Sequence, residues 1–90
     1  MAYQLDITNR FRRSYTKLSP ELQDAVDDAI RTLANGRPYP VGLRAKKMKG
    51  HKFIFEASPT MACRITFEYE NPDYMILRNV GEHDVTLKNP

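Results

Sequence analysis

The most informative absence in this sequence is that of acidic side chains from its middle. No aspartate or glutamate occurs between Arg31 and Phe55, although the chain carries 11 acidic residues against 14 lysines and arginines. A cationic segment without compensating acids is typical of a surface that binds a polyanion, most often a phosphate backbone. The alternative is a solvated, lysine-rich approach to a strand. The cations of this window are Arg31, Arg37, Arg44, Lys46, Lys47, Lys49 and Lys52, most of them within residues 42–52, the basic segment.

Other absences narrow the class of protein. The chain has one cysteine, Cys63, so no disulfide can form within it, and a reducing compartment is the simpler assumption. No apolar run approaches the ~18 residues of a membrane-spanning helix, and the N-terminus lacks the charged-then-apolar layout of a signal peptide. Two histidines and one cysteine form no recognisable metal-binding spacing. We therefore expect a cytoplasmic protein without a bound metal and without a membrane partner.

The size of the chain limits its organisation. Its 90 residues suffice for one domain around one core, and a hydrophobic content of 41% excludes wholesale disorder. The net charge of +3 is small but unevenly distributed, because the acids gather in residues 21–28 and in the last third. We predict a single domain over residues 1–90, with a basic middle that faces an acidic partner.

The first third of the sequence predicts a strand and a helical hairpin. Apolar and polar residues alternate over residues 3–8, as in a half-buried strand. Asn9 is expected to cap a short helix that ends near Leu18, because Ser19-Pro20 follows and the residue before a proline avoids the helical conformation. Ser19 then caps a second helix with a continuous apolar stripe, which ends at Asn35.

The second half predicts an antiparallel meander followed by a polar tail from Gly81. The expected strands are residues 52–57, 63–69 and 74–80, with turns at residues 58–60 and 71–73. Phe53, Phe55 and Ala57 alternate with Lys52, Ile54 and Glu56 in the first of these strands. The order β-α-α-β-β-β predicts an α+β fold, in which a small antiparallel or mixed sheet carries the helical hairpin on one face.

Strand phase places two arginines on one face of this sheet. If Cys63, Ile65 and Phe67 face the helices, Arg64 points to the opposite, open face. The same reasoning applied to the following strand points Arg78 outward. We therefore expect a cationic surface formed by the two arginines and bordered by the basic segment.

Short motifs along the chain match a known family in order. They are FRRSYTKL at 11–18, SPEL at 19–22, GLR at 42–44, KMKG at 47–50, Glu56, Arg64-Ile65 and VGEHD at 80–84. On these motifs the sequence resembles the RelE/ParE superfamily of type II toxin–antitoxin toxins, and within it the RelE and HigB branch of messenger-RNA-cleaving toxins. The resemblance implies a sheet with a helical hairpin on one face and an RNA-binding surface on the other.

The activity that this resemblance implies is that of an mRNA interferase. Such a toxin is a metal-independent endoribonuclease that cuts messenger RNA in the ribosomal decoding site and so inhibits translation. The 2′-hydroxyl attacks the adjacent phosphodiester, which requires a base, cations for the phosphorane charge and an acid for the leaving oxygen. The implied partners are the ribosome, messenger RNA and an antitoxin whose acidic, amphipathic segment covers the cations. No cofactor is implied.

The resemblance also assigns residues by position. Arg64 would stabilise charge on the phosphate, Lys49 would contact it and assist proton transfer, and His83 would be the acid or base, oriented by Asp84. Histidine suits this role because its unperturbed pKa is ~6.5. The predicted RNA- or phosphate-binding residues are Arg44, Lys46, Lys47, Lys49, His51 and Arg78.

Two departures from the family pattern keep other functions open. Leu87 stands where many relatives have a tyrosine, and Ser58 stands near Glu56 where an arginine is common. Leucine can neither stack on a base nor help to activate a hydroxyl. The alternatives are a ParE-like DNA gyrase inhibitor without enzymatic activity, and a decayed toxin that still binds antitoxin or RNA.

Overall fold

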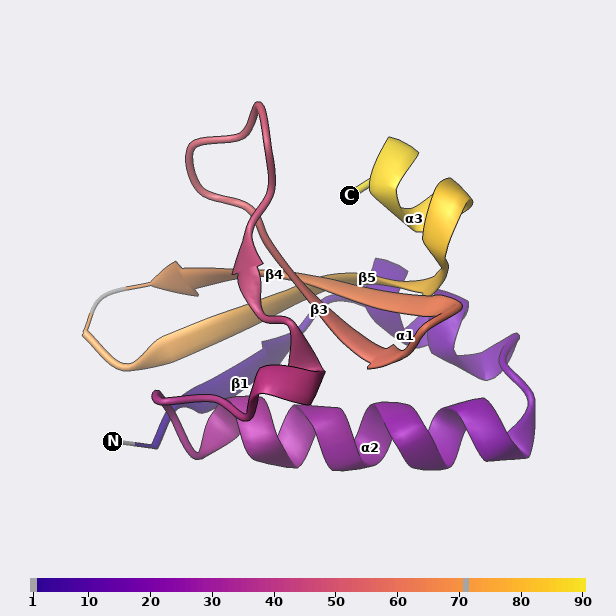
Figure 1. Ribbon diagram of the computed structural model, residues 1–90, viewed down its shortest axis with the longest axis horizontal. Coiled ribbons are helices and arrows are strands. Elements are labelled where there is room, and N and C mark those ends of the chain that lie inside the picture. Colours follow the sequence, from indigo (N-terminus) through magenta and orange to yellow (C-terminus); the bar gives the residue numbers. More distant parts are fainter. Residues whose placement is uncertain (1, 71) are drawn as a thin grey trace.

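A five-stranded mixed sheet organises the computed structural model, which describes residues 2–70 and 72–90 (Figure 1). The strands are β1 (Gln4–Ile7), β2 (Lys46–Lys47), β3 (Phe55–Thr60), β4 (Cys63–Glu70) and β5 (Tyr74–Glu82). Their order across the sheet is β1-β5-β4-β3-β2. β1 runs parallel to β5 and the other neighbours are antiparallel. The predicted mixed sheet and α+β class are therefore confirmed.

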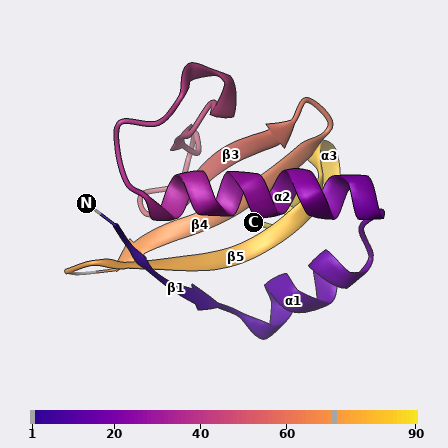
Figure 2. The same ribbon diagram turned by 90° about the horizontal axis from the view of Figure 1, so that it is seen from below.

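The predicted helical hairpin covers one face of this sheet. It consists of α1 (Asn9–Thr16) and α2 (Pro20–Ala34). The longer helix, α2, lies below the strands in Figure 1 and in front of them in Figure 2. Val26 and Leu33 of α2 are fully buried, as are Ile65 and Phe67 of β4. The core therefore lies between the hairpin and the sheet, as the apolar stripes of the sequence require.

The caps of the two helices follow the sequence with one correction. Ser19 caps α2 as predicted, since its side chain accepts a hydrogen bond from the Leu22 amide. The cap of α1 is Thr8 and not Asn9, because the Thr8 hydroxyl accepts from the Phe11 amide at 3.1 Å. Both residue types satisfy the free amides of a first helical turn, so the sequence pattern located this helix start to within one residue.

The C-terminal tail, which was predicted only to be polar from Gly81, forms regular structure. β5 continues through Gly81 to Glu82, and residues His83–Lys88 form a further helix, α3. Glu82 caps α3 by accepting from the Asp84 amide. With six residues and a single buried side chain, Thr86, α3 lacks the apolar periodicity that marks a helix in sequence.

The turn between β3 and β4 also lies elsewhere than predicted. β3 begins at Phe55 and runs to Thr60, and the chain turns at residues 61–62. Pro59 is tolerated within the strand because the register shifts between Ala57 and Thr60, a position where a missing amide hydrogen costs no ladder bond. Of the turn predicted at residues 71–73, Asn71 lies outside the described residues.

Two further elements connect α2 to β3. A 3-10 turn, η1 (Val41–Leu43), precedes β2, so the basic segment contains a short helix and a short strand that its charge pattern did not indicate. Within the described residues, no helix is long and apolar enough to cross a membrane.

Gly81 sets how closely α3 can approach β5. A Cβ at this position would lie 2.9 Å from the Thr86 hydroxyl, a buried atom of a short side chain. We predict that Gly81→Ala destabilises the fold by about 1–3 kcal/mol through overpacking, measured by urea denaturation. Gly42→Ala is the matched control, because a Cβ there meets no atom within 4 Å. Equal stability of the two variants would contradict this packing.

Candidate nucleic-acid interface

Two elements stand on the face of the sheet opposite α1 and α2, here called the outer face. One is α3, and the other is the basic hairpin, residues 46–55, which joins β2 to β3. Both rise on the same side of the sheet in Figure 1. The outer face therefore lies between a lysine-rich hairpin and the helix that begins with His83.

The basic hairpin has a defined conformation. The Met48 amide donates to the Ile54 carbonyl at 2.8 Å, and the His51 amide donates to the Met48 carbonyl at 3.2 Å. Met48 is buried, and Gly50 has a φ of +84°, a conformation that glycine adopts without a steric penalty. The tip of the hairpin is thus held by backbone hydrogen bonds and one buried anchor.

The lysines of this hairpin are exposed, and their side chains point to different faces of the strand. Lys46 pairs in register with Glu56, and Lys47 pairs with Phe55, whose ring packs on the core. Because neighbouring residues of a strand point to opposite faces, Lys46 shares the outer face with Glu56 and Lys47 points the other way. In the described part of the chain, Lys46, Lys47, Lys49 and Lys52 form no ion pair.

His83 and Asp84 are in contact at the start of α3. The Nδ1 atom of His83 lies 2.8 Å from an Asp84 carboxylate oxygen, and the imidazole is partly exposed, with 44% of its side chain accessible. When Nδ1 carries the proton and donates it to this carboxylate, Nε2 is a base with a free lone pair. The pair therefore has the geometry that proton transfer requires.

Arg64 lies on the predicted face, but it is not an open cation. Its Nη1 atom donates to the carbonyls of Thr60, Met61 and Cys63 at 3.1, 3.0 and 2.8 Å. Its Nε atom is 3.7 Å from a Glu56 carboxylate oxygen, and the two side chains are only 10% and 11% exposed. Among the described residues, Nη2 makes no hydrogen bond.

Arg78 is also paired. Its Nη1 atom binds the Glu68 carboxylate and its Nε atom donates to the Pro90 backbone oxygen at 3.1 Å. The two arginines that were predicted to form a cationic surface are therefore each paired with a glutamate, Glu56 or Glu68, which compensates their charge. Both glutamates alternate with apolar residues along their strands, and this period-2 signal could have revealed the pairing.

Arg44 and Arg64 line the same cavity. It has a volume of about 280 Å³ beside the turn between β3 and β4, where Thr60 and Met61 also contribute to its wall. Arg44 is exposed and adopts a left-handed conformation, with a φ of 51°. The predicted site residue His51 lies half-buried in the basic hairpin instead. The candidate residues thus fall into three groups: the hairpin, the turn beside Arg64, and α3.

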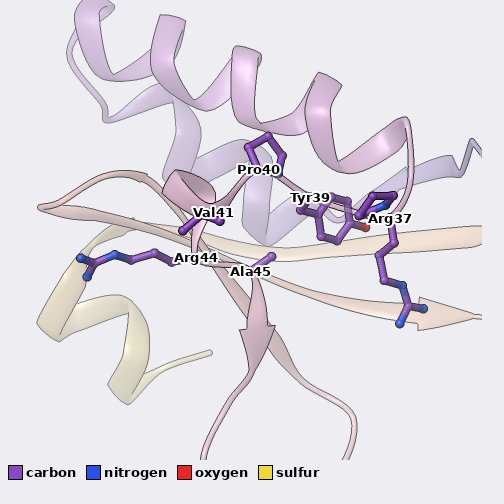
Figure 3. Close-up of a pocket in the computed structure, with 7 residues that line it drawn as sticks. Arg37, Tyr39, Pro40, Val41, Arg44 and Ala45 are labelled. Atoms are coloured by element: carbon purple, nitrogen blue, oxygen red, sulfur yellow. The ribbon is translucent and has the colours of Figure 1, made fainter.

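A larger cavity than this one does not join these groups. It has a volume of about 600 Å³ and follows the connection between α2 and β2, from Arg37 to Ala45. Its two arginines, Arg37 and Arg44, extend in opposite directions (Figure 3), and the Arg37 guanidinium lies 4.9 Å from the centre of the Tyr69 ring. No charged groups of the described residues converge on this hollow, so it is not the candidate site.

Burial limits what Cys63, Ser58 and Leu87 can contribute to a site. The last two are the positions at which the sequence departs from the family pattern. Burial raises the pKa of the Cys63 thiol, which makes it a poor nucleophile. Ser58 is buried in β3 and Leu87 is half-buried in α3, so neither offers a stacking surface. Within the described residues, no group of three metal-binding side chains comes together.

Comparisons with known proteins identify the fold. No protein-family model matches the sequence, and neither does any curated protein. The structure is similar to YafQ from the E. coli DinJ–YafQ toxin–antitoxin complex, with a TM-score of 0.77 and 12% identity over 94% of this chain and 97% of the other. The chain therefore has the fold of the RelE/YafQ toxins of toxin–antitoxin systems.

Two other toxins give the same result. The RelBE2 toxin–antitoxin complex of Mycobacterium tuberculosis matches with a TM-score of 0.68 and 21% identity, over 92% of this chain and all of that one (100%). A mutant of the E. coli toxin RelE in the free state matches with a TM-score of 0.73 and 15% identity, over 96% and 88%. The first of these toxins was crystallised with its antitoxin, as was YafQ.

Arg64 should matter for stability more than Arg78 does. Removing Arg64 leaves the Glu56 carboxylate buried without a counter-charge and frees three turn carbonyls, which costs about 3 kcal/mol or more. The Arg78–Glu68 pair is more exposed, so Arg78→Ala should cost roughly 1 kcal/mol. Urea denaturation of both variants measures the difference, and equal losses would show that Arg64 does not support the turn.

Proposed function

We propose that this protein is the toxin of a toxin–antitoxin pair and acts as a ribosome-dependent messenger-RNA endonuclease. The observation that carries the proposal is the His83–Asp84 pair at the start of α3, a helix that rises from the same face of the sheet as the lysine-rich hairpin (Figure 1). On a RelE/YafQ-type fold, this arrangement offers a proton-transfer group and phosphate-binding cations on one surface.

The proposed chemistry is an internal transfer of the phosphoryl group within the RNA. The 2′-hydroxyl loses its proton and attacks the adjacent phosphorus, and the bond to the 5′-oxygen breaks as that oxygen gains a proton. The products are a 2′,3′-cyclic phosphate and a new 5′-hydroxyl. Atoms balance without water or a metal ion.

Each candidate residue has a role that its environment permits. His83 transfers a proton through Nε2, and Asp84 holds the ring through Nδ1. Lys46 and Lys49 bind phosphate and stabilise its negative charge in the transition state, and Lys49 assists the proton transfer. Lys47, which points to the other face of β2, can contact phosphate only outside this site. Arg64 contributes through Nη2, and its other nitrogens hold the turn on which the site is built. Arg44, His51 and Arg78 border the RNA path.

Two observations favour a second candidate, a toxin that binds but does not cut. Both outer-face arginines are compensated by glutamates, and Leu87 offers no aromatic ring to the substrate. Such a protein would still bind an acidic antitoxin segment through the exposed lysines. A ParE-like gyrase inhibitor is the third candidate. The experiment described next separates all three candidates.

The test is inducible expression of the wild type, His83→Ala and Lys49→Ala, with mapping of transcript 5′ ends. We expect growth arrest with new 5′ ends inside translated messages, and loss of both in the His83 variant, because removing a general acid or base costs about 100-fold or more in rate. Lys17→Ala, an exposed lysine at the end of α1, is the matched control for Lys49→Ala and should behave as wild type.

The other outcomes decide between the alternatives. Growth arrest without new 5′ ends contradicts the nuclease and favours gyrase inhibition. No arrest from a folded protein favours the toxin that only binds. Arrest and cleavage that persist in His83→Ala would leave the nuclease standing and remove His83 from its mechanism.

A further inference from the structure

Phe53 is an aromatic residue that the fold leaves in solvent. Its side chain is 72% exposed, more than any other aromatic side chain among the described residues, Tyr74 being next at 40%. It lies near the tip of the basic hairpin, outside β3. The sequence predicted that Phe53 belongs to a strand with Phe55 and Ala57, and the structure shows that it does not.

The exposure of Phe53 follows from the course of the chain. Phe55, two residues later, packs against Phe67 and Tyr69, with ring centres 5.8 and 4.9 Å apart. Phe53 would join this cluster if β3 continued backwards. Instead, the Met48–Ile54 hydrogen bond closes the hairpin one residue after Phe53, and the chain leaves the sheet plane. The ring is therefore held away from the core by a defined backbone.

The surroundings of Phe53 identify the kind of partner. Lys52 precedes it, Lys49 and His51 belong to the same loop, and the nearest acid in sequence is Glu56, which is buried beside Arg64. An apolar protein surface placed over Phe53 would leave these cations facing apolar groups. A single-stranded nucleic acid offers both a base with two π-faces and flanking phosphates.

We propose that Phe53 stacks on an unpaired base of the RNA, and that Lys49 and Lys52 contact the phosphates on either side of it. This inference rests on the proposed function and deepens it, because it assigns a base-contacting residue. Leu87, at the position where relatives carry an aromatic ring, cannot stack and is half-buried in α3. The stacking platform of this protein is then on the basic hairpin, which rises from the same face of the sheet as α3 (Figure 1).

The chain contains no tryptophan, which makes a direct test possible. Phe53→Trp introduces a single indole at the proposed platform, and Thr16→Trp places one at the exposed end of α1, on the opposite side of the sheet, as the control. Each variant is titrated at low ionic strength with a short single-stranded oligoribonucleotide. Tryptophan emission and the anisotropy of a labelled copy of the same RNA are recorded together. We expect quenching in the Phe53 variant and none in the Thr16 variant.

A second variant tests the contribution to affinity. Phe53→Leu keeps an apolar side chain of similar size but removes the aromatic face, and because the residue is exposed its unfolding should match wild type. We expect RNA binding to weaken by roughly 5- to 150-fold, the range for loss of one stacked base. RNA binding by Phe53→Leu at wild-type strength would overturn the stacking inference. So would RNA that binds the Phe53→Trp protein without quenching its indole. Either result would leave the proposed function standing.

Failure of the proposed function looks different. If the wild-type protein binds no oligonucleotide even at low salt, the stacking inference is rejected, whereas the proposed function is rejected only if expression produces no new 5′ ends in translated messages. Quenching of the Phe53→Trp protein by an acidic peptide but not by RNA would reassign Phe53 to a protein partner and also reject the stacking inference.

Discussion

The outer face depends on the turn between β3 and β4, and that turn depends on Arg64. Three of its carbonyls, those of Thr60, Met61 and Cys63, accept hydrogen bonds from one guanidinium nitrogen. The carbonyl of Ala62, in the same turn, accepts from the His83 amide at 2.8 Å. The residue that fixes the turn thereby also fixes where α3 begins.

This connection gives Arg64 a positioning role beside any role in charge stabilisation. Its side chain is buried with Glu56, and a buried cation persists only when its hydrogen-bonding groups are largely satisfied. Loss of activity in an Arg64 variant would therefore not by itself show contact with phosphate. The Nη2 atom, which has no hydrogen-bond partner within the described residues, is the group through which we propose that Arg64 acts on a substrate.

The sheet itself offers little free positive charge, because Arg64 and Arg78 pair with glutamates. The lysines of the basic hairpin and Arg44 are exposed and form no ion pair within the described residues. Exposed charges of this kind release counterions when phosphate binds. Gly81 and the buried Thr86 bring α3 against the same face of the sheet from which the hairpin rises (Figure 1).

The sequence predicted the parts of this fold that depend on periodic burial. The stripes of α2 and the alternation of β4 are unambiguous, because each buries one face of an element. It did not predict α3, since a six-residue helix with one buried side chain has no periodic signal. Strand phase placed Arg64 on the correct face, yet it gave no information on burial, which depends on Glu56 across the strand pair. The exposure of Phe53 required knowing where the hairpin leaves the sheet.

The most direct test of the proposed nuclease is the chemistry of the ends it leaves. Purified protein is added to ribosomes stalled on a defined message, and the 3′ ends of the upstream fragments are analysed. Attack by the 2′-hydroxyl predicts 2′,3′-cyclic phosphates, formed by the wild type and not by His83→Ala. Fragments with 3′-hydroxyl ends, or an intact message on ribosomes that the protein demonstrably binds, would contradict the proposal that this surface cuts messenger RNA.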